Sequence, residues 1–111
     1  MEIKQKDVVL LPYPFTDLKG KKVRPALIVS NDFVNNKSKD CIMLPLTSVI
    51  KDEHYSIVIN QDDLNSGQLI KPSRIKIDKI FTVEKRLIVM KIGTLSDNTF
   101  EKVKAELLNV F

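Results

Sequence analysis

The sequence predicts a mainly β protein of the α+β type, in which a small antiparallel barrel or strongly bent sheet carries one C-terminal helix. Short apolar or alternating segments are separated by turn residues, and the connections between them are too short for crossover helices. Only the C-terminal segment repeats its apolar residues at helical spacing. A two-layer α+β packing of another topology is the alternative.

The first half of the chain predicts three strands. Residues 7–12 form an apolar run that ends at Pro12, and residues 24–30 contain the most hydrophobic run. Residues 41–48 are interrupted by Pro45, which predicts an edge or bulged strand because proline cannot donate to a ladder. The connecting segments are predicted to be a loop over residues 13–22 and a polar connection over residues 31–40.

The second half alternates between apolar and polar residues. Residues 54–60 place Tyr55, Ile57 and Ile59 on one face, and residues 61–67 are predicted to be a turn. From residue 73 onward, Ile75 and Ile77 are expected to face the core, and a further strand covers residues 87–95. The opposite face of the strand after residue 73 is then expected to carry Arg74, Lys76 and Asp78.

Residues 96–111 predict the closing helix. Ser96 is the expected N-cap, and Asp97 stands in the first turn, where the helix dipole favours a negative charge. The buried face is predicted to be Phe100, Val103, Leu107 and Val110. The chain end, Val110 and Phe111, is interpreted as packing against the core.

Length and composition predict one domain, residues 1–111, large enough for a core without disulfides. The net charge of +4 and the pI near 9.2 permit an anionic partner but do not require one. The N-terminal apolar run is too short for a signal peptide or a membrane span. With a single cysteine, these features predict a cytoplasmic protein without a membrane association.

Arg24 is the first candidate functional residue. Arginine is the rarer cation of this chain, and Pro25 biases Arg24 towards an extended conformation at the mouth of a buried strand. A guanidinium presented there suits a phosphate, since it is planar and always charged. The alternative is a surface arginine paired with Asp17 or Asp32.

Two other sets of residues could bind a polyanion. Thr47 and Ser48 end a strand, and their hydroxyls can bond phosphate oxygens or simply close a local turn. The predicted face of Arg74, Lys76 and Asp78 suits a phosphate and a base edge; its alternative is a solvated face with weak internal ion pairs.

The small numbers of histidine, cysteine and glycine residues argue against several kinds of catalytic chemistry. His54 is the only histidine, which excludes a two-histidine ribonuclease and argues against a histidine-ligated metal. Cys41 has no neighbouring histidine to activate it as a nucleophile. The three glycines are not clustered, so a glycine-rich phosphate loop is absent, and no cofactor is expected.

Three segments in order resemble the MazF/PemK family of toxin endoribonucleases. They are Lys6-Asp7-Val8, Arg24-Pro25-Ala26-Leu27-Ile28-Val29 and Leu44-Pro45-Leu46-Thr47-Ser48. The segment "SRIKIDKIFTVEKRL", residues 73–87, is similar to the family's later strand and threonine-containing turn. Two positions depart from the pattern: Lys6 replaces the usual glycine, and Lys76 stands where some relatives carry arginine.

The resemblance implies an SH3-like barrel that forms a homodimer and is blocked by a cognate antitoxin. It also implies metal-independent cleavage of single-stranded RNA by the 2′-hydroxyl, which leaves a 2′,3′-cyclic phosphate and a 5′-hydroxyl. Arg24 and Thr47 carry over as catalytic residues. The RNA contacts are expected to be Lys19, Lys21, Lys22, Ser48, Arg74, Lys76 and Asp78, without a metal.

Two other functions remain open. One is a non-enzymatic toxin of the CcdB type, which poisons gyrase, lacks the Arg-Pro and Thr pair and contacts its target through the C-terminus. The other is an RNA-binding barrel with weak catalysis. Arg24 and Thr47 favour the endoribonuclease over both.

Overall fold

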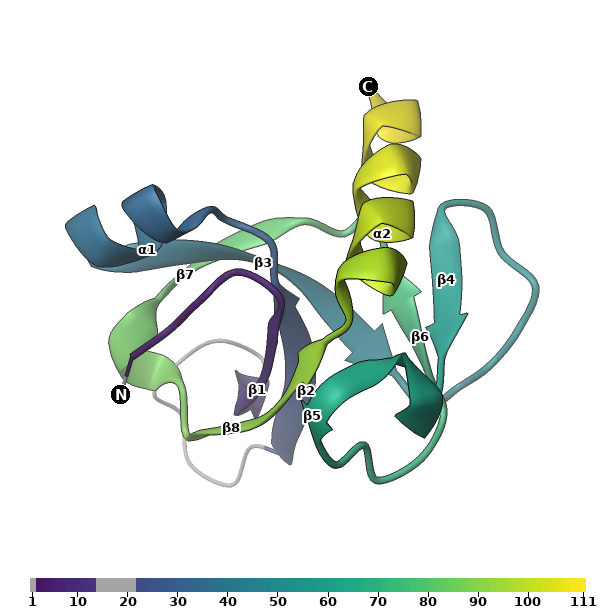
Figure 1. Cartoon of the computed structure of the whole chain (residues 1–111), viewed down its shortest axis with the longest axis horizontal. Helices are drawn as coiled ribbons and strands as arrows, with labels where there is room; N and C mark the ends of the chain where they lie inside the picture. The colour runs from purple at the N-terminus through teal and green to yellow at the C-terminus, as the bar shows by residue number, and fades with distance from the viewer. Residues whose placement is uncertain (1, 14–21) are drawn as a thin grey trace.

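The structure, a computed structural model, describes residues 2–13 and 22–111 (Figure 1). The elements follow one another as β1 (Asp7–Tyr13), β2 (Lys22–Ile28), α1 (Asp32–Lys37), β3 (Asp40–Thr47), β4 (Ser56–Ile59), β5 (Leu64–Gly67), β6 (Ser73–Lys76), β7 (Phe81–Glu84), β8 (Met90–Leu95) and α2 (Asp97–Val110).

The eight strands of the described residues form one curled antiparallel sheet. Its order is β4-β6-β3-β2-β1-β8-β5, and β7 pairs with β3 beside β6. All the strand pairings are antiparallel, as expected for connections without crossovers. The predicted fold class, a barrel-like antiparallel sheet with a C-terminal helix, is confirmed.

β3 has partner strands on both sides, so of the two predicted alternatives, an edge strand or a bulged strand, the edge strand was wrong. One side of β3 pairs with β2, and the other side pairs first with β7 and then with β6. Pro45 falls between these last two partners: β7 pairs with residues 40–43 and β6 with residues 46–47. The missing N–H of Pro45 is accommodated where the partner strand changes.

Four other segments differ from the prediction. Residues 31–40 contain helix α1, because the side chain of Asn31 accepts the N–H of Val34 and caps it. Residues 61–67 form a 3₁₀ turn and strand β5 instead of a turn alone. The predicted strand over residues 87–95 begins only at Met90, and residues 81–84 form the unpredicted strand β7.

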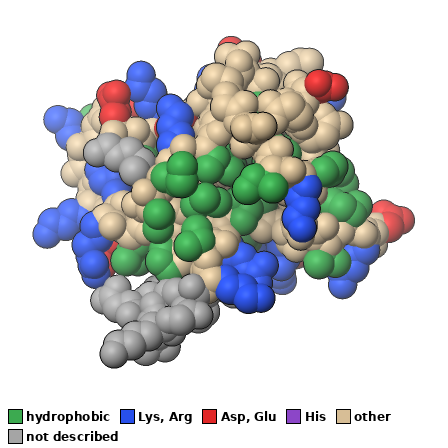
Figure 2. All heavy atoms as spheres, turned by 90° about the horizontal axis from the view of Figure 1, so that it is seen from below, with side chains coloured by type: hydrophobic (Ala, Val, Ile, Leu, Met, Phe, Trp, Pro, Cys, Tyr) green, Lys and Arg blue, Asp and Glu red, His purple; other side chains and the backbone are tan. Residues whose placement is uncertain are grey.

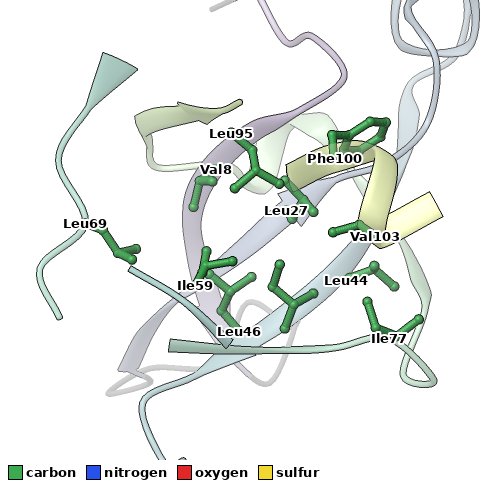
Figure 3. Packing of buried hydrophobic residues seen from close by; sticks show 11 residues of the cluster. Val8, Leu27, Leu44, Leu46, Ile59, Leu69, Ile77, Leu95, Phe100 and Val103 are labelled. Atoms are coloured by element: carbon green, nitrogen blue, oxygen red, sulfur yellow. The ribbon is translucent and has the colours of Figure 1, made fainter. Parts of the chain in front are cut away.

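The sheet separates two hydrophobic clusters. The larger one joins the sheet to α2, and Figure 3 shows Phe100 and Val103 of the helix above Leu27 and Leu44. The smaller one lies on the other sheet face and includes the following buried residues: Ile3, Val9, Leu11, Ala26, Ile28, Cys41, Met43, Val83 and Ile88. Neighbouring residues of one strand therefore serve different clusters, as the alternation of side chains requires.

Helix α2 confirms its predicted cap and buried face. The hydroxyl of Ser96 accepts the N–H of Thr99, while Phe100 and Val103 are buried and Leu107 and Val110 pack beside them. Phe111 was expected to pack against the core, but its side chain is 86% exposed. The helix extends beyond the sheet in Figure 1, so its last residue has no neighbouring layer to cover it. Within the described residues, we find no helix with the length and apolarity needed to cross a membrane.

Candidate active-site cleft

Arg24 and Thr47 line the same cleft, just beyond the end of the β2–β3 ladder. The last pair of that ladder is Ala26 with Pro45; Arg24 precedes Ala26 by two residues, and Thr47 follows Pro45 by two. Arg24 shares its face with Ala26 and Ile28, as Thr47 does with Pro45 and Met43. Both side chains therefore continue the sheet face that carries the smaller cluster, beyond the point at which that cluster ends.

A cleft of about 530 Å³ opens at this place. Its described lining comes from four strands and the segments after them: Arg24, Pro25, Pro45, Leu46, Thr47, Val49, Lys76, Lys79 and Phe81. Apolar surface from two prolines, a valine and a phenylalanine thus lies among three cations and a hydroxyl. Such a lining suits a ligand that combines a phosphate with a flat apolar group.

The hydroxyl of Thr47 is held by the chain that follows it. The N–H of Val49 donates to Thr47 Oγ1 over 3.1 Å. Because this bond uses a lone pair of the oxygen, the O–H proton stays available for an acceptor in the cleft. Thr47 is also half-buried, so the orientation of its side chain is restrained by its surroundings.

The charge of the cleft is positive. The described lining contains the cations Arg24, Lys76 and Lys79 and no carboxylate. Asp78 is exposed beside the cleft, and its carboxylate lies 3.8 Å from the ammonium group of Lys79. An anion in the cleft would therefore meet several cations held by separate strands, without a fixed negative charge among the described lining residues.

Arg74 is placed differently from its prediction. Ile75 and Ile77 are fully buried as expected, but Arg74, on the opposite face, is only 3% exposed. Its Nη1 lies 3.1 Å from Glu53 Oε2, and its Nε donates to the carbonyl of Val49 over 3.4 Å. The alternative of a solvated face does not hold for Arg74, because the segment between β3 and β4 supplies both partners.

Glu53 has two cationic neighbours. A hydrogen bond from Lys51, together with the charge of Arg74, holds the pKa of Glu53 below its usual value against the opposing effect of burial. Glu53 is therefore ionised at neutral pH and is the counter-ion of the buried guanidinium.

Of the remaining predicted contacts, two are exposed close in sequence to Arg24 and Thr47, and two fall outside the described residues. Lys22 is exposed two residues before Arg24, and Ser48 is exposed directly after Thr47. Neither belongs to the described lining. Lys19 and Lys21 fall outside the described residues, so their expected RNA contacts stay predictions.

Six lining residues were not among the predicted site residues: Pro25, Pro45, Leu46, Val49, Lys79 and Phe81. Lys79 and Phe81 follow β6 in a segment without a regular pattern, and only the pairing of Met43 with Phe81 brings the ring to the cleft. The available signal was proximity in sequence, since Val49 is two residues after Thr47 and Lys79 three after Lys76.

Cys41 and His54 lie outside the described lining of the cleft. Burial raises the pKa of the Cys41 thiol to about 11, so the nucleophilic thiolate is scarce at neutral pH. His54 is exposed near the ring of Tyr55. In the ranges 2–13 and 22–111, no group of three or more histidine, cysteine or acidic residues is arranged to hold a metal.

Comparison with solved structures supports the fold over nearly the whole chain. An endoribonuclease from a mycobacterial species, in complex with its cognate antitoxin, has a TM-score of 0.78 at 19% identity, covering 97% of this chain and 93% of that one. The Mycobacterium tuberculosis toxin MazF-mt6 has a TM-score of 0.76 at 18% identity, covering 95% of each chain. MazE–MazF from Deinococcus radiodurans has a TM-score of 0.77 at 19% identity, covering 99% of this chain and 96% of that one.

Sequence comparison identifies the family directly. No curated protein sequence matches the chain significantly. The family model for PemK-like, MazF-like toxins of type II toxin–antitoxin systems matches residues 4–111, which include all the described lining residues of the cleft. The chain therefore belongs to the PemK-like, MazF-like toxin family of type II toxin–antitoxin systems.

Proposed function

We propose that this toxin is a metal-independent endoribonuclease that cleaves single-stranded RNA, including mRNA, within one domain formed by residues 1–111. The observation that carries the proposal is the cationic cleft that both Arg24 and Thr47 line. Family membership and the endoribonuclease structures of similar fold support the same activity.

The proposed reaction is an internal phosphoryl transfer. The 2′-oxygen of one nucleotide attacks its own 3′-phosphorus and loses its proton, while the bond from phosphorus to the 5′-oxygen of the next nucleotide breaks. That oxygen takes up a proton and leaves as a 5′-hydroxyl, and the phosphate closes to a 2′,3′-cyclic ester. The non-bridging oxygens gain negative charge in the transition state, which is where preorganised donors act.

Arg24 and Thr47 supply those donors in the proposal. The guanidinium of Arg24 stabilises the charge on the phosphorane, and the free O–H of Thr47 donates to a non-bridging oxygen. Both come from the ends of strands that are anchored in a packed core, so little reorganisation is required when the charge develops.

In this proposal, water carries out part of the proton transfer. Arginine is a poor base at neutral pH, because its pKa is above about 12. Asp78 is the nearest predicted carboxylate, and its interaction with Lys79 places it beside the cleft. We therefore propose that charge stabilisation provides most of the catalysis and that Asp78 contributes through substrate contact.

RNA binding is divided between charged and apolar surfaces. Lys76 and Lys79 would bind backbone phosphates, with Lys22, Ser48 and the predicted contacts Lys19 and Lys21 extending the track. Phe81 offers a ring on which a base can stack, and single-stranded RNA is commonly held in this way. The combination favours a single strand over a duplex, whose bases are already stacked.

The proposed partners follow from the family. We propose that the toxin acts in the cytoplasm as a homodimer and is blocked by a cognate antitoxin. Related MazF structures include complexes with MazE, and the type II systems are defined by this pairing. A positive cleft suits an acidic antitoxin segment as well as RNA.

The decisive experiment uses purified toxin, excess EDTA and a mixed-sequence single-stranded RNA. We expect discrete cuts with cyclic-phosphate ends, and a loss of about a hundredfold or more in rate for Arg24→Ala and for Thr47→Ala. Arg86→Ala is the control, because Arg86 is an exposed arginine that pairs with Glu84.

Other outcomes would identify the alternatives. Tight RNA binding without cleavage would indicate an RNA-binding barrel. Neither binding nor cleavage by a folded protein would overturn the proposal and favour a target such as gyrase, for which the exposed Phe111 is available as a C-terminal contact.

A further inference from the structure

Arg74 is a buried cation next to the backbone of Thr47. In the β3–β6 ladder, Thr47 and Arg74 are direct partners, and the Arg74 side chain is 4% exposed. A buried guanidinium is stable only when its charge is compensated and its donors are bonded. The partners of Arg74 therefore indicate which segments of the chain its buried side chain connects.

The Arg74 side chain contacts two residues of the segment between β3 and β4. Nη1 reaches the carboxylate of Glu53 at 3.1 Å, and Nε donates to the carbonyl of Val49 at 3.4 Å. Glu53 is also bound by Lys51 at 3.2 Å, so the carboxylate joins two cations. Arg74 thereby ties this segment to β6 at the edge of the cleft, which Val49 lines.

Val49 connects Arg74 to the hydroxyl of Thr47. Its carbonyl accepts from Arg74 on one side, and its N–H donates to Thr47 Oγ1 at 3.1 Å on the other. The bond at Oγ1 determines which lone pair of the hydroxyl is used and where its proton can point. A shift of Val49 would therefore change the direction of the Thr47 hydroxyl without touching Thr47 itself.

We propose that Arg74 is a positioning residue that orients the hydroxyl of Thr47 through Val49, with Glu53 as its counter-ion. This inference rests on the proposed function for the role of Thr47. It replaces the expectation that Arg74 binds RNA, because the side chain is only 4% exposed and its Nη1 and Nε already contact Glu53 and the Val49 carbonyl. The cations left for RNA are those that line the cleft, together with Lys22 and the predicted contacts Lys19 and Lys21.

The central variant is Arg74→Met, which keeps the volume and removes the charge. It should fold, because Glu53 is partly exposed and keeps Lys51 as a partner, so the substitution leaves no buried, unpaired charge. The matched control is Arg86→Met, at an exposed arginine that pairs with Glu84. Arg74→Lys keeps the charge but loses the planar fork that reaches two acceptors.

The first measurement is made on the protein without RNA. Hydrogen exchange at the Val49 amide should become at least about tenfold faster in Arg74→Met and stay unchanged in Arg86→Met. Protection at core amides should stay the same in all variants, which separates a local change from general unfolding. Unchanged exchange at Val49 would overturn the proposal, whether or not the toxin cleaves RNA.

The second measurement is RNA cleavage. Arg74→Met should lower kcat roughly tenfold to a hundredfold while KM and the salt dependence of binding stay unchanged, with Arg74→Lys in between. A direct phosphate contact would instead weaken binding and reduce the salt slope by about one. That result would restore Arg74 as an RNA ligand and overturn the positioning role.

A double-mutant cycle with Thr47→Ala completes the test. Because this variant lacks the hydroxyl, Arg74→Met should cause no further loss of kcat in its background. An equal loss in both backgrounds would show that Arg74 acts independently of Thr47 and would also overturn the proposal. Absence of any cleavage by the wild type would instead contradict the proposed function, and the exchange data would still decide whether Arg74 holds Val49.

Discussion

Lys6 has a backbone conformation that explains why the family pattern has glycine at this position. Its φ is +82°, in the left-handed region that side chains with a Cβ rarely adopt. In this conformation the N–H of Lys6 donates to the carbonyl of Ile28, and its carbonyl accepts from Leu95. The Lys6 side chain forms an ion pair with Asp97, which raises the pKa of Lys6.

Two substitutions at Lys6 separate strain from ion pairing. Lys6→Ala and Lys6→Gly both remove the ion pair with Asp97, but only glycine relieves the left-handed backbone. We expect Lys6→Gly to be more stable than Lys6→Ala by about 1 kcal/mol in urea unfolding. Equal stabilities, or a more stable alanine variant, would contradict a strained backbone at this position.

At the residue scale, the sequence was most informative where one residue constrains its neighbour. Pro25 restricts Arg24, and the alternation of β2 and β3 then predicts the face of Arg24 and of Thr47. The burial of Arg74 was not predictable, since it depends on a carboxylate 21 residues away in sequence. Lys79 and Phe81 were missed for the same reason: strand pairing, not local pattern, brings Phe81 to the cleft.

At the element scale, α2 is fastened to the sheet by a polar network at its first turn. The hydroxyl of Ser96 accepts from the N–H of Thr99, and the hydroxyl of Thr99 donates to Asp63 at 2.8 Å. The N–H of Ser96 also donates to the carbonyl of Asp63. The helix start and the 3₁₀ turn before β5 are therefore stabilised together.

Removing the cap tests this attachment. Ser96→Ala should lower the free energy of unfolding by about 1 kcal/mol, because the N–H of Thr99 loses its acceptor. Ser66→Ala is the matched control, at an exposed serine of β5. Chemical denaturation measures both; similar effects of the two changes would show that Ser96 contributes no more than a surface serine.

Elements with a strong local signal were predicted, and those that depend on their partners were not. The cap and the apolar spacing of α2 are local, so its start and buried face were found. β5 and β7 have only four residues each, and β5 is largely exposed. They are strands because β8 and β3 offer hydrogen-bonding edges, and such long-range pairing is not visible in a short segment.

At the scale of the whole molecule, one face is more apolar than a monomer requires. β1, β5 and β8 lie on the lower side in Figure 1, and Figure 2, seen from below, shows hydrophobic side chains gathered between lysines and arginines. A groove of about 760 Å³ is lined there by apolar side chains from these strands and the segment after β5: Leu10, Ile70, Met90 and Ile92. Such a face favours contact with a second copy.

The proposed homodimer can be tested at this groove. The side chain of Ile70 is 83% exposed, so Ile70→Lys should leave the fold intact and weaken self-association at least about tenfold, because a buried lysine must be desolvated. Leu108→Lys, at a 74% exposed leucine of α2, is the control. Molar mass measured by light scattering across a dilution series reports both variants.

The outcomes of that series are distinct. Dissociation caused by Leu108→Lys and not by Ile70→Lys would move the interface to α2. A wild-type protein that stays monomeric at every concentration would contradict the homodimer itself.

The register of β2 against β3 has a consequence for when the cleft can form during synthesis and folding of the chain. A slip of one residue would turn Arg24 to the sheet face that packs against α2, away from the cleft that Thr47 lines. No short piece of the chain holds the cleft, since its lining extends from Arg24 to Phe81 and requires several strands to have paired. Under the proposed function, the nascent chain is therefore unable to cleave the messenger that encodes it until the strands that line the cleft have paired.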